Sequence, residues 1–209
     1  MFKYEVLVLG ELQTNCYLLW DEESKEAGII DGADDGVAIS EEIEKRQLKP
    51  KYILATHGHF DHNLGALDLK LIYNIPFCAS QKDWFLLERQ QETAKHFLKM
   101  EIKVPNLKEI DINLDNREEL EIGGKIVKII KTPGHTPGGL SFLAENLLFS
   151  GDTIFAEGMR GQTNHLYSST KDIYKSINEI LNLPKDTIIL SGHGDATTVS
   201  EARQFFGKD

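Results

Sequence analysis

Cysteine is scarce in this chain of 209 residues, which contains only two. Cys16 and Cys78 each lie in a short apolar run, where we expect them to be small buried side chains. This cysteine usage excludes a disulfide-rich scaffold and makes a cytoplasmic location the default expectation.

Long hydrophobic runs are also missing. No apolar stretch approaches the roughly 20 residues of a membrane-spanning helix. The N-terminus does not have the shape of a signal peptide, because the apolar residues 6–9 are few and Glu11 follows them closely. We therefore expect no membrane partner.

Basic residues are outnumbered in the sequence, with 23 Lys and Arg against 33 Asp and Glu and a formal net charge of -10. Such a balance disfavours attraction to a nucleic-acid backbone or to an anionic membrane. A small-molecule substrate is the expected partner, and nucleic acid is not. Because 41% of the residues are hydrophobic and no linker-like tract interrupts the chain, we expect one domain covering residues 1–209.

Strand-like and helical patterns recur along the chain, with strands first and then helices and strands in turn. We expect strands near residues 5–9, 15–20, 27–31, 51–55, 125–130, 140–143, 147–149 and 187–190, and helices near 37–46, 64–73 and 80–98, from 171 and from 198. Ser80 and Asp83 resemble a capping box for the third helix, and Thr198 and Glu201 one for the last. Residues 101–121 are polar and mixed, which indicates a loop with short strands.

The least ordinary segment is residues 57–62, in which His57, His59 and His62 lie beside Asp61. It falls on the turn between the expected strand 51–55 and the expected helix 64–73. In such a turn, His57 and His59 project to one side and can share a metal, whereas Asp61 and His62 face a second position. The competing interpretation of Asp61 is a helix N-cap that needs no metal.

Three later segments carry further candidate ligands in glycine-containing turns at expected strand ends. These are His135 in residues 132–138, Asp152 in residues 150–153 and His193 in residues 191–194. Rigid scaffolds commonly hold their chemistry at such positions.

Together, and in this order, these segments resemble the metallo-β-lactamase superfamily, and within it the short proteins of the glyoxalase II (hydroxyacylglutathione hydrolase) branch. The resemblance runs from residues 14–17 to residues 192–194. It implies an α+β fold, a four-layer αβ/βα sandwich. It also implies a first metal held by His57, His59 and His135, a second held by Asp61, His62 and His193, and a bridging Asp152; Asp61 is in addition assigned a catalytic role.

The resemblance implies a binuclear metal-dependent hydrolase that attacks a small thioester or related ester with a metal-bridging hydroxide. The two divalent ions are expected to be zinc, with iron or manganese as alternatives. A thiolate leaves with a conjugate-acid pKa of about 8.5, whereas the amine of a lactam must be protonated. Many lactam-cleaving members lack a histidine at the position of His62 and use a cysteine ligand, and no cysteine lies near these motifs. S-lactoylglutathione or another thiol ester is the expected substrate.

Other interpretations stay open at this point. A mononuclear Fe(II) persulfide dioxygenase would use His57, His135 and Asp152. Arg160 is expected either to bind a substrate carboxylate or to lie on the surface.

The chain stops shortly after residue 194, without the C-terminal helical domain with which glutathione-specific members hold the thiol. His96 and His165 are expected on the surface, with a site or pocket role as the alternative for His165.

Overall fold

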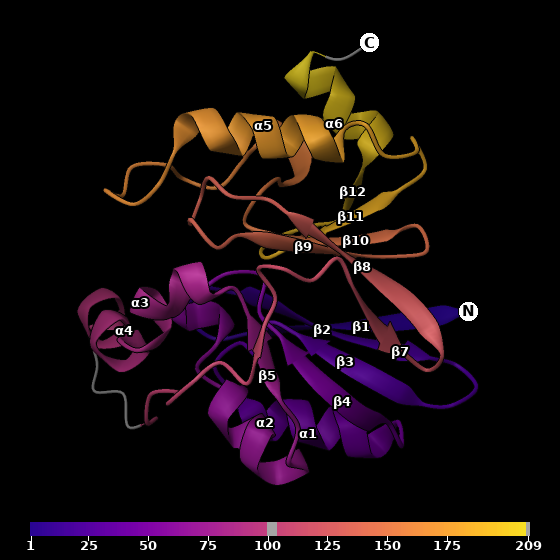
Figure 1. The fold of residues 1–209 in the computed structure, drawn as a ribbon, viewed down its shortest axis with the longest axis vertical. Coiled ribbons are helices and arrows are strands. Elements are labelled where there is room, and N and C mark those ends of the chain that lie inside the picture. The colour runs from indigo at the N-terminus through magenta and orange to yellow at the C-terminus, as the bar shows by residue number, and fades with distance from the viewer. Residues whose placement is uncertain (100–103, 208–209) are drawn as a thin grey trace.

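The computed structural model describes residues 1–99 and 104–207, so residues 101–103 of the expected loop lie outside the described part. Two six-stranded sheets pack face to face, and helices cover the outer face of each (Figure 1). This is the α+β four-layer sandwich that the family resemblance implies. None of the helices in the described ranges is long and apolar enough to cross a membrane.

The first sheet comes from the N-terminal half of the chain. Its strands, in spatial order, are β1 (Phe2–Leu9), β2 (Thr14–Asp21), β3 (Glu26–Ile30), β4 (Lys49–Leu54), β5 (Phe77–Ala79) and β6 (Ile112–Asn113). The pairs β1–β2 and β2–β3 are antiparallel, and the pairs from β3 to β6 are parallel. The crossovers carry α1 (Gly36–Lys45) and α2 (Ala66–Tyr73), which lie against the outer face (Figure 1).

The second sheet comes from the C-terminal half. Its strands, in spatial order, are β12 (Thr197–Thr198), β11 (Ile188–Ser191), β10 (Leu147–Gly151), β9 (Leu140–Ala144), β8 (Lys125–Lys131) and β7 (Glu119–Ile122). Only the pair of β10 and β11 is parallel, and α5 (Thr170–Ile180) lies in the crossover between them. The last helix, α6 (Val199–Phe206), begins with the predicted capping box of Thr198 and Glu201.

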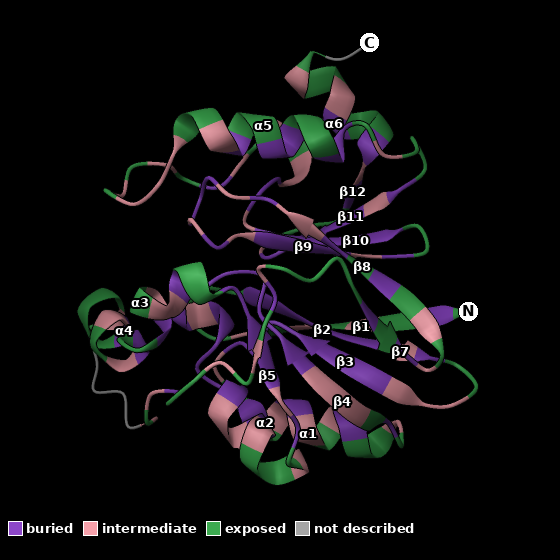
Figure 2. Cartoon of the chain, viewed as in Figure 1, coloured by how far each residue is buried: buried purple, intermediate pink, exposed green. Residues whose placement is uncertain are grey.

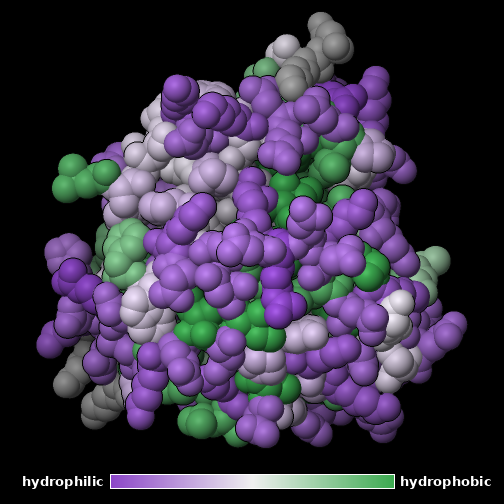
Figure 3. Space-filling model, in the orientation of Figure 1, coloured by the Kyte–Doolittle hydropathy of each residue, from purple (hydrophilic) through white to green (hydrophobic). Residues whose placement is uncertain are grey.

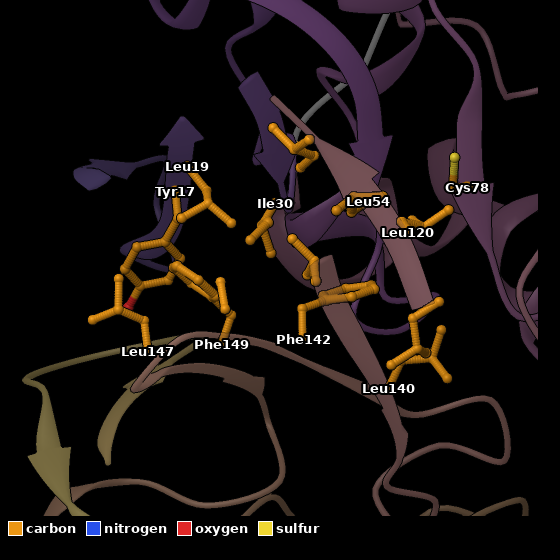
Figure 4. Close-up of a cluster of buried hydrophobic side chains, with 14 of the residues drawn as sticks. Tyr17, Leu19, Ile30, Leu54, Cys78, Leu120, Leu140, Phe142, Leu147 and Phe149 are labelled. Carbon is orange, nitrogen blue, oxygen red and sulfur yellow. The ribbon is translucent and has the colours of Figure 1, made fainter. Parts of the chain in front are cut away.

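The main hydrophobic core lies between the sheets. Tyr17 and Ile30 of the first sheet face Phe142 and Phe149 of the second (Figure 4), and all four side chains are buried. The central strands are mostly buried, whereas the edge strand β1 and the outward faces of the helices are largely exposed (Figure 2), and hydrophilic side chains cover most of the face in view in Figure 3. This packing holds the strand ends of both sheets in fixed positions, which is what a ligand site requires.

The prediction of a single helix over residues 80–98 is wrong. The segment forms a 3₁₀ turn (Gln81–Asp83), a short α3 (Trp84–Leu87) and then α4 (Gln90–Leu98). The break has a physical cause, because the Asn106 amide donates to the carbonyl of Glu88 at 2.8 Å and accepts from Gln91 N at 2.8 Å. The prediction of a capping box at Ser80 is wrong as well. Its second member, the Asp83 carboxylate, points into the protein and does not return to the backbone of Ser80.

Candidate metal centre

The seven candidate ligands meet at one edge of the two sheets, because each follows a strand whose end lies there. His57, His59, Asp61 and His62 follow β4, His135 lies between β8 and β9, and Asp152 and His193 follow β10 and β11. The backbones of the two halves are joined at this edge, where Asn15 N donates to Gly192 O at 2.8 Å. The sheet packing therefore brings together side chains that are up to 136 residues apart in the chain.

A first group of ligand atoms comes from His57, His59, His135 and Asp152, all within 4.8 Å of one another. The His59 Nδ1 atom lies 3.1 Å from His57 Nε2 and 3.0 Å from His135 Nε2. Asp152 Oδ2 lies 3.5 Å from His135 Nε2. Three nitrogens and one oxygen at these separations form a donor set suited to zinc, iron or manganese.

A second group comes from Asp61, His62 and His193. His62 Nε2 and His193 Nε2 lie 3.3 Å apart, and Asp61 Oδ2 lies 3.5 Å and 3.4 Å from them. Asp61 does not cap a helix, because its carboxylate accepts a hydrogen bond from Thr14 Oγ1 at 3.2 Å and α2 begins without a side-chain cap. The N-cap interpretation of Asp61 is therefore wrong.

Asp152 lies between the two groups. Its Oδ2 atom faces the first group, while Oδ1 lies 3.5 Å from His62 Nε2 and 3.7 Å from His193 Nε2. Oδ1 is buried and has no hydrogen-bond partner. An unpartnered buried carboxylate oxygen is costly unless a cation binds it, so the residues present fit a pair of divalent ions. Gly192 leaves the room for this arrangement, because a Cβ there would lie 2.3 Å from Asp152 Oδ1.

The outer nitrogen of each ligand histidine has its own oxygen partner. The pairs are His57 Nδ1 with Thr56 Oγ1 at 3.0 Å, His59 Nε2 with Tyr167 Oη at 2.9 Å, His62 Nδ1 with Asp31 Oδ2 at 2.8 Å, His135 Nδ1 with Gln162 O at 2.8 Å, and His193 Nδ1 with Leu12 O at 3.0 Å. A ring that donates from its outer nitrogen presents a lone pair on its inner nitrogen. Such inner lone pairs converge on each ligand group, which again fits bound cations.

Asp31 orients two of these histidines at once. Its Oδ2 atom accepts from Thr56 Oγ1 at 2.8 Å, the same hydroxyl that contacts His57, and lies 2.8 Å from His62 Nδ1. Its Oδ1 atom accepts from Thr56 N at 2.8 Å. Asp31 thus supports the ligand histidines without belonging to either ligand group.

Asp83 is a supporting residue that sequence reasoning missed. Its buried carboxylate accepts from Gly58 N at 2.9 Å, from Thr136 Oγ1 at 2.7 Å and from Gly138 N at 2.6 Å. Burial raises the pKa of the carboxyl, and these three donors partly offset it. Asp83 thus ties the turn of His57 and His59 to the turn of His135. No local pattern marks this role, because Asp83 stands three residues after a serine like any capping residue.

Charge and burial act differently on the histidines of the protein without metal. Burial and the neighbouring imidazoles lower the pKa of His57 well below its usual value, and burial with His135 lowers the pKa of His59 to about 3. Burial also lowers the pKa of His62, but the carboxylates of Asp61, Asp31 and Asp152 outweigh it and raise the pKa to about 10. At neutral pH His57 and His59 are therefore free of protons, whereas His62 holds one.

Metal binding is expected to depend on pH at the second group. Because His62 keeps its proton below about pH 10, a metal at the second group must displace it, and affinity rises up to tenfold per pH unit between pH 6 and 8. His59, with a pKa of about 3, holds no proton to displace in that range. Calorimetric titration with Zn²⁺ in buffers of different ionisation enthalpy measures the released protons. If neither zinc-binding event released protons, the expected displacement of the His62 proton would be wrong.

Tyr167 is a second residue that the sequence did not reveal. Its hydroxyl contacts His59, and its ring stacks on His165 with centroids 5.0 Å apart. Burial raises the pKa of Tyr167 to about 12, so the phenol stays protonated. His165 is half-buried beside the site, so its expected surface position is wrong and the pocket alternative describes it better; His96 is exposed, as predicted.

Replacing Tyr167 by phenylalanine removes the acceptor for His59 Nε2. We expect Tyr167→Phe to weaken metal binding at the first group by 10- to 100-fold, a typical effect of losing such a partner. A zinc competition titration measures it, with Tyr4→Phe, an exposed tyrosine on β1, as the control. Equal zinc affinity in both variants would show that the hydroxyl does not position His59.

A cavity of about 520 Å³ opens over both ligand groups and is lined by ligands of each, including His59, His135 and His193. Arg160 also lines it, which is where the sequence suggested a substrate contact. One guanidinium nitrogen of Arg160 donates to Gly161 O at 2.9 Å and to Thr163 Oγ1 at 3.2 Å, and the group lies over the Tyr174 ring at 5.0 Å. The side chain is thus held in place at the cavity wall.

A two-sheet sandwich with histidine and aspartate groups of this spacing at its strand ends defines a class of metal-dependent hydrolases. The chain belongs to the metallo-β-lactamase superfamily, whose sequence model matches residues 9–193.

Individual relatives are similar to this chain over almost their whole length. The chain is 34% identical to "Hydroxyacylglutathione hydrolase GloC" of Haemophilus influenzae, covering 96% of this chain and 94% of that protein. Among solved structures, "BLEG-1 B3 metallo-beta-lactamase" has a TM-score of 0.88 at 33% identity, covering 97% of each chain. "TTHA1623 in a di-iron-bound form" has a TM-score of 0.82 at 27% identity, covering 96% of each chain.

Proposed function

We propose that this chain is a binuclear metal-dependent hydrolase of a small thioester or related ester. The observation that carries the proposal is the position of Asp152, whose two oxygens face two separate ligand groups while Oδ1 lacks any other partner. In the proposal His57, His59 and His135 hold the first ion, Asp61, His62 and His193 hold the second, and Asp152 bridges them.

The ions proposed are zinc, with iron or manganese as alternatives. When bound, two such ions lower the pKa of a shared water to about 7 and polarise a carbonyl oxygen. The residues of the chain supply the rest: Tyr167 and Asp31 hold the histidine rings in orientation, and Asp61, fixed by Thr14, lines the cavity beside His193. We propose that Asp61 contributes to catalysis as a ligand of the second ion. Arg160 is proposed to contact a polar or anionic part of the substrate.

The choice of thioester has two supports. A thiolate is a good leaving group that needs no protonating residue. The relative from Haemophilus influenzae is named as a hydroxyacylglutathione hydrolase, and the di-iron form of TTHA1623 is in keeping with two ions. A mononuclear dioxygenase fits less well, because it would leave Asp61, His62 and His193 without a role.

β-Lactam hydrolysis is a second candidate, because a structure 33% identical to this chain is described as a B3 metallo-β-lactamase. The two functions are separated by assaying the zinc-, iron- and manganese-loaded protein on S-lactoylglutathione, on a panel of other thioesters and on β-lactams. We expect thioester turnover to exceed lactam turnover, with His59→Ala abolishing it. Turnover of lactams and of no thioester would refute the proposal.

The proposal includes a single domain over residues 1–209 and a cytoplasmic location. It also includes a small-molecule substrate, with neither nucleic acid nor membrane as a partner. The net charge of -10 supports the choice of partner, since phosphate-rich surfaces would repel the protein.

A further inference from the structure

Large apolar side chains surround the candidate metal centre on the cavity side. Leu12, Phe97 and Met159 line the cavity and are nevertheless 44%, 57% and 58% exposed. The same cavity is also lined by Phe60, which is buried, and by Leu86 and Phe155, which are partly buried. Exposed apolar side chains that gather at one opening commonly mark a binding surface, because burying them under a ligand is favourable.

This apolar surface begins next to the ligand histidines and extends to α4. The Phe155 ring lies 6.4 Å from the His193 ring, between centroids. Phe60, beside Asp61 in the chain, stacks on Phe97 of α4 with centroids 5.9 Å apart. A carbonyl carbon held at the ligand groups would therefore direct one of its substituents along an apolar wall.

Few charged side chains line the cavity. Among the described residues that line it, Arg160 is the only lysine or arginine, and Asp61 and Asp152 belong to the proposed ligand set. A glutathione thioester carries two carboxylates and an ammonium, for which one cation is a poor match. A lactoyl group is shorter than a butyryl group and carries a hydroxyl, so it buries less apolar surface against this wall.

We propose that the acyl group of the substrate is an extended apolar chain that lies against Leu12, Phe97 and Met159, while Arg160 contacts the polar thiol portion. The inference rests on the proposed thioesterase function and narrows its substrate class. Hydrolysis adds one water, breaks the bond between the carbonyl carbon and sulfur, and releases a carboxylate, a thiol and a proton. Each added methylene that leaves water is worth about 0.8 kcal/mol, roughly a fourfold gain in kcat/KM.

The test is a series of S-acyl-N-acetylcysteamine thioesters with acetyl, butyryl, hexanoyl, octanoyl and lactoyl groups, assayed with the metal-loaded protein. We expect kcat/KM to rise at least 30-fold from acetyl to hexanoyl and the lactoyl ester to fall below butyryl. A flat or falling series, or a preference for lactoyl, would overturn the inference and leave the thioesterase proposal standing. Hydrolysis of none of them, nor of S-lactoylglutathione, would overturn both.

Two variants test whether the dependence of kcat/KM on acyl chain length arises at the apolar cavity wall. In Phe97→Ser/Met159→Ser we expect the dependence on chain length to shrink at least tenfold, whereas Leu71→Ser, an exposed apolar residue on α2 outside the cavity lining, keeps it. A readout without turnover is calorimetric binding of the product carboxylates, where octanoate should bind at least tenfold more tightly than acetate. Equal binding of the two carboxylates, or an unchanged series in the double variant, would overturn the inference.

Discussion

Replacing Asp152 by asparagine is expected to reduce hydrolytic activity on the order of a thousandfold or more and to lower the metal content from two ions to at most one. Asparagine has the same shape, but it presents one oxygen and one NH₂ group and carries no charge. In the native protein Oδ2 faces His135 and Oδ1 faces His62 and His193, so both oxygens are required.

Asp186→Asn is the matched control, because Asp186 is exposed in the loop before β11 and away from the cavity. Activity on a thioester and metal content by elemental analysis are measured for both variants beside the native protein. If Asp152→Asn kept two ions and more than a tenth of the activity, a bridging role for this residue would be wrong.

Replacing Asp83 by alanine is expected to lower the free energy of unfolding by about 3–5 kcal/mol. The substitution leaves two buried backbone N–H groups, those of Gly58 and Gly138, without an acceptor, and each such loss costs about 1–3 kcal/mol. The Thr136 hydroxyl loses its partner as well. Because these donors belong to the turns of His57, His59 and His135, we also expect weaker metal binding at the first group.

Urea unfolding of the metal-free protein isolates the structural effect from the loss of bound metal. Asp186→Ala serves as the control, and Asp83→Asn, which keeps one acceptor oxygen, should fall between the two. A loss of less than 1 kcal/mol in Asp83→Ala would mean that Asp83 does not hold the two turns together.

The sequence predicts the parts of this protein that depend on local patterns. Most strands of both sheets, though not β5 and β12, follow from alternating or continuous apolar runs. The cluster of His57, His59, Asp61 and His62 is visible because its members are neighbours in the chain. His135, Asp152 and His193 stand out because each occupies a glycine-containing turn after a strand, and the packing of the sheets brings these turns to one edge.

What the sequence does not predict depends on contacts between distant segments. Asp83 binds backbone groups 25 and 55 residues away, and Tyr167 contacts His59 across 108 residues. The break between α3 and α4 is caused by Asn106, which comes from a later loop. The cavity likewise combines side chains from several loops, so its apolar character becomes visible only in the folded protein.

The central claim is that two ligand groups hold two ions with Asp152 between them. The most direct test is the number of metal ions per chain, measured by elemental analysis of protein saturated with zinc, iron or manganese and freed of excess metal. The account predicts two ions per chain in the native protein and one in His193→Ala. A native protein that binds one ion at saturation, with the same content in His193→Ala, would contradict it.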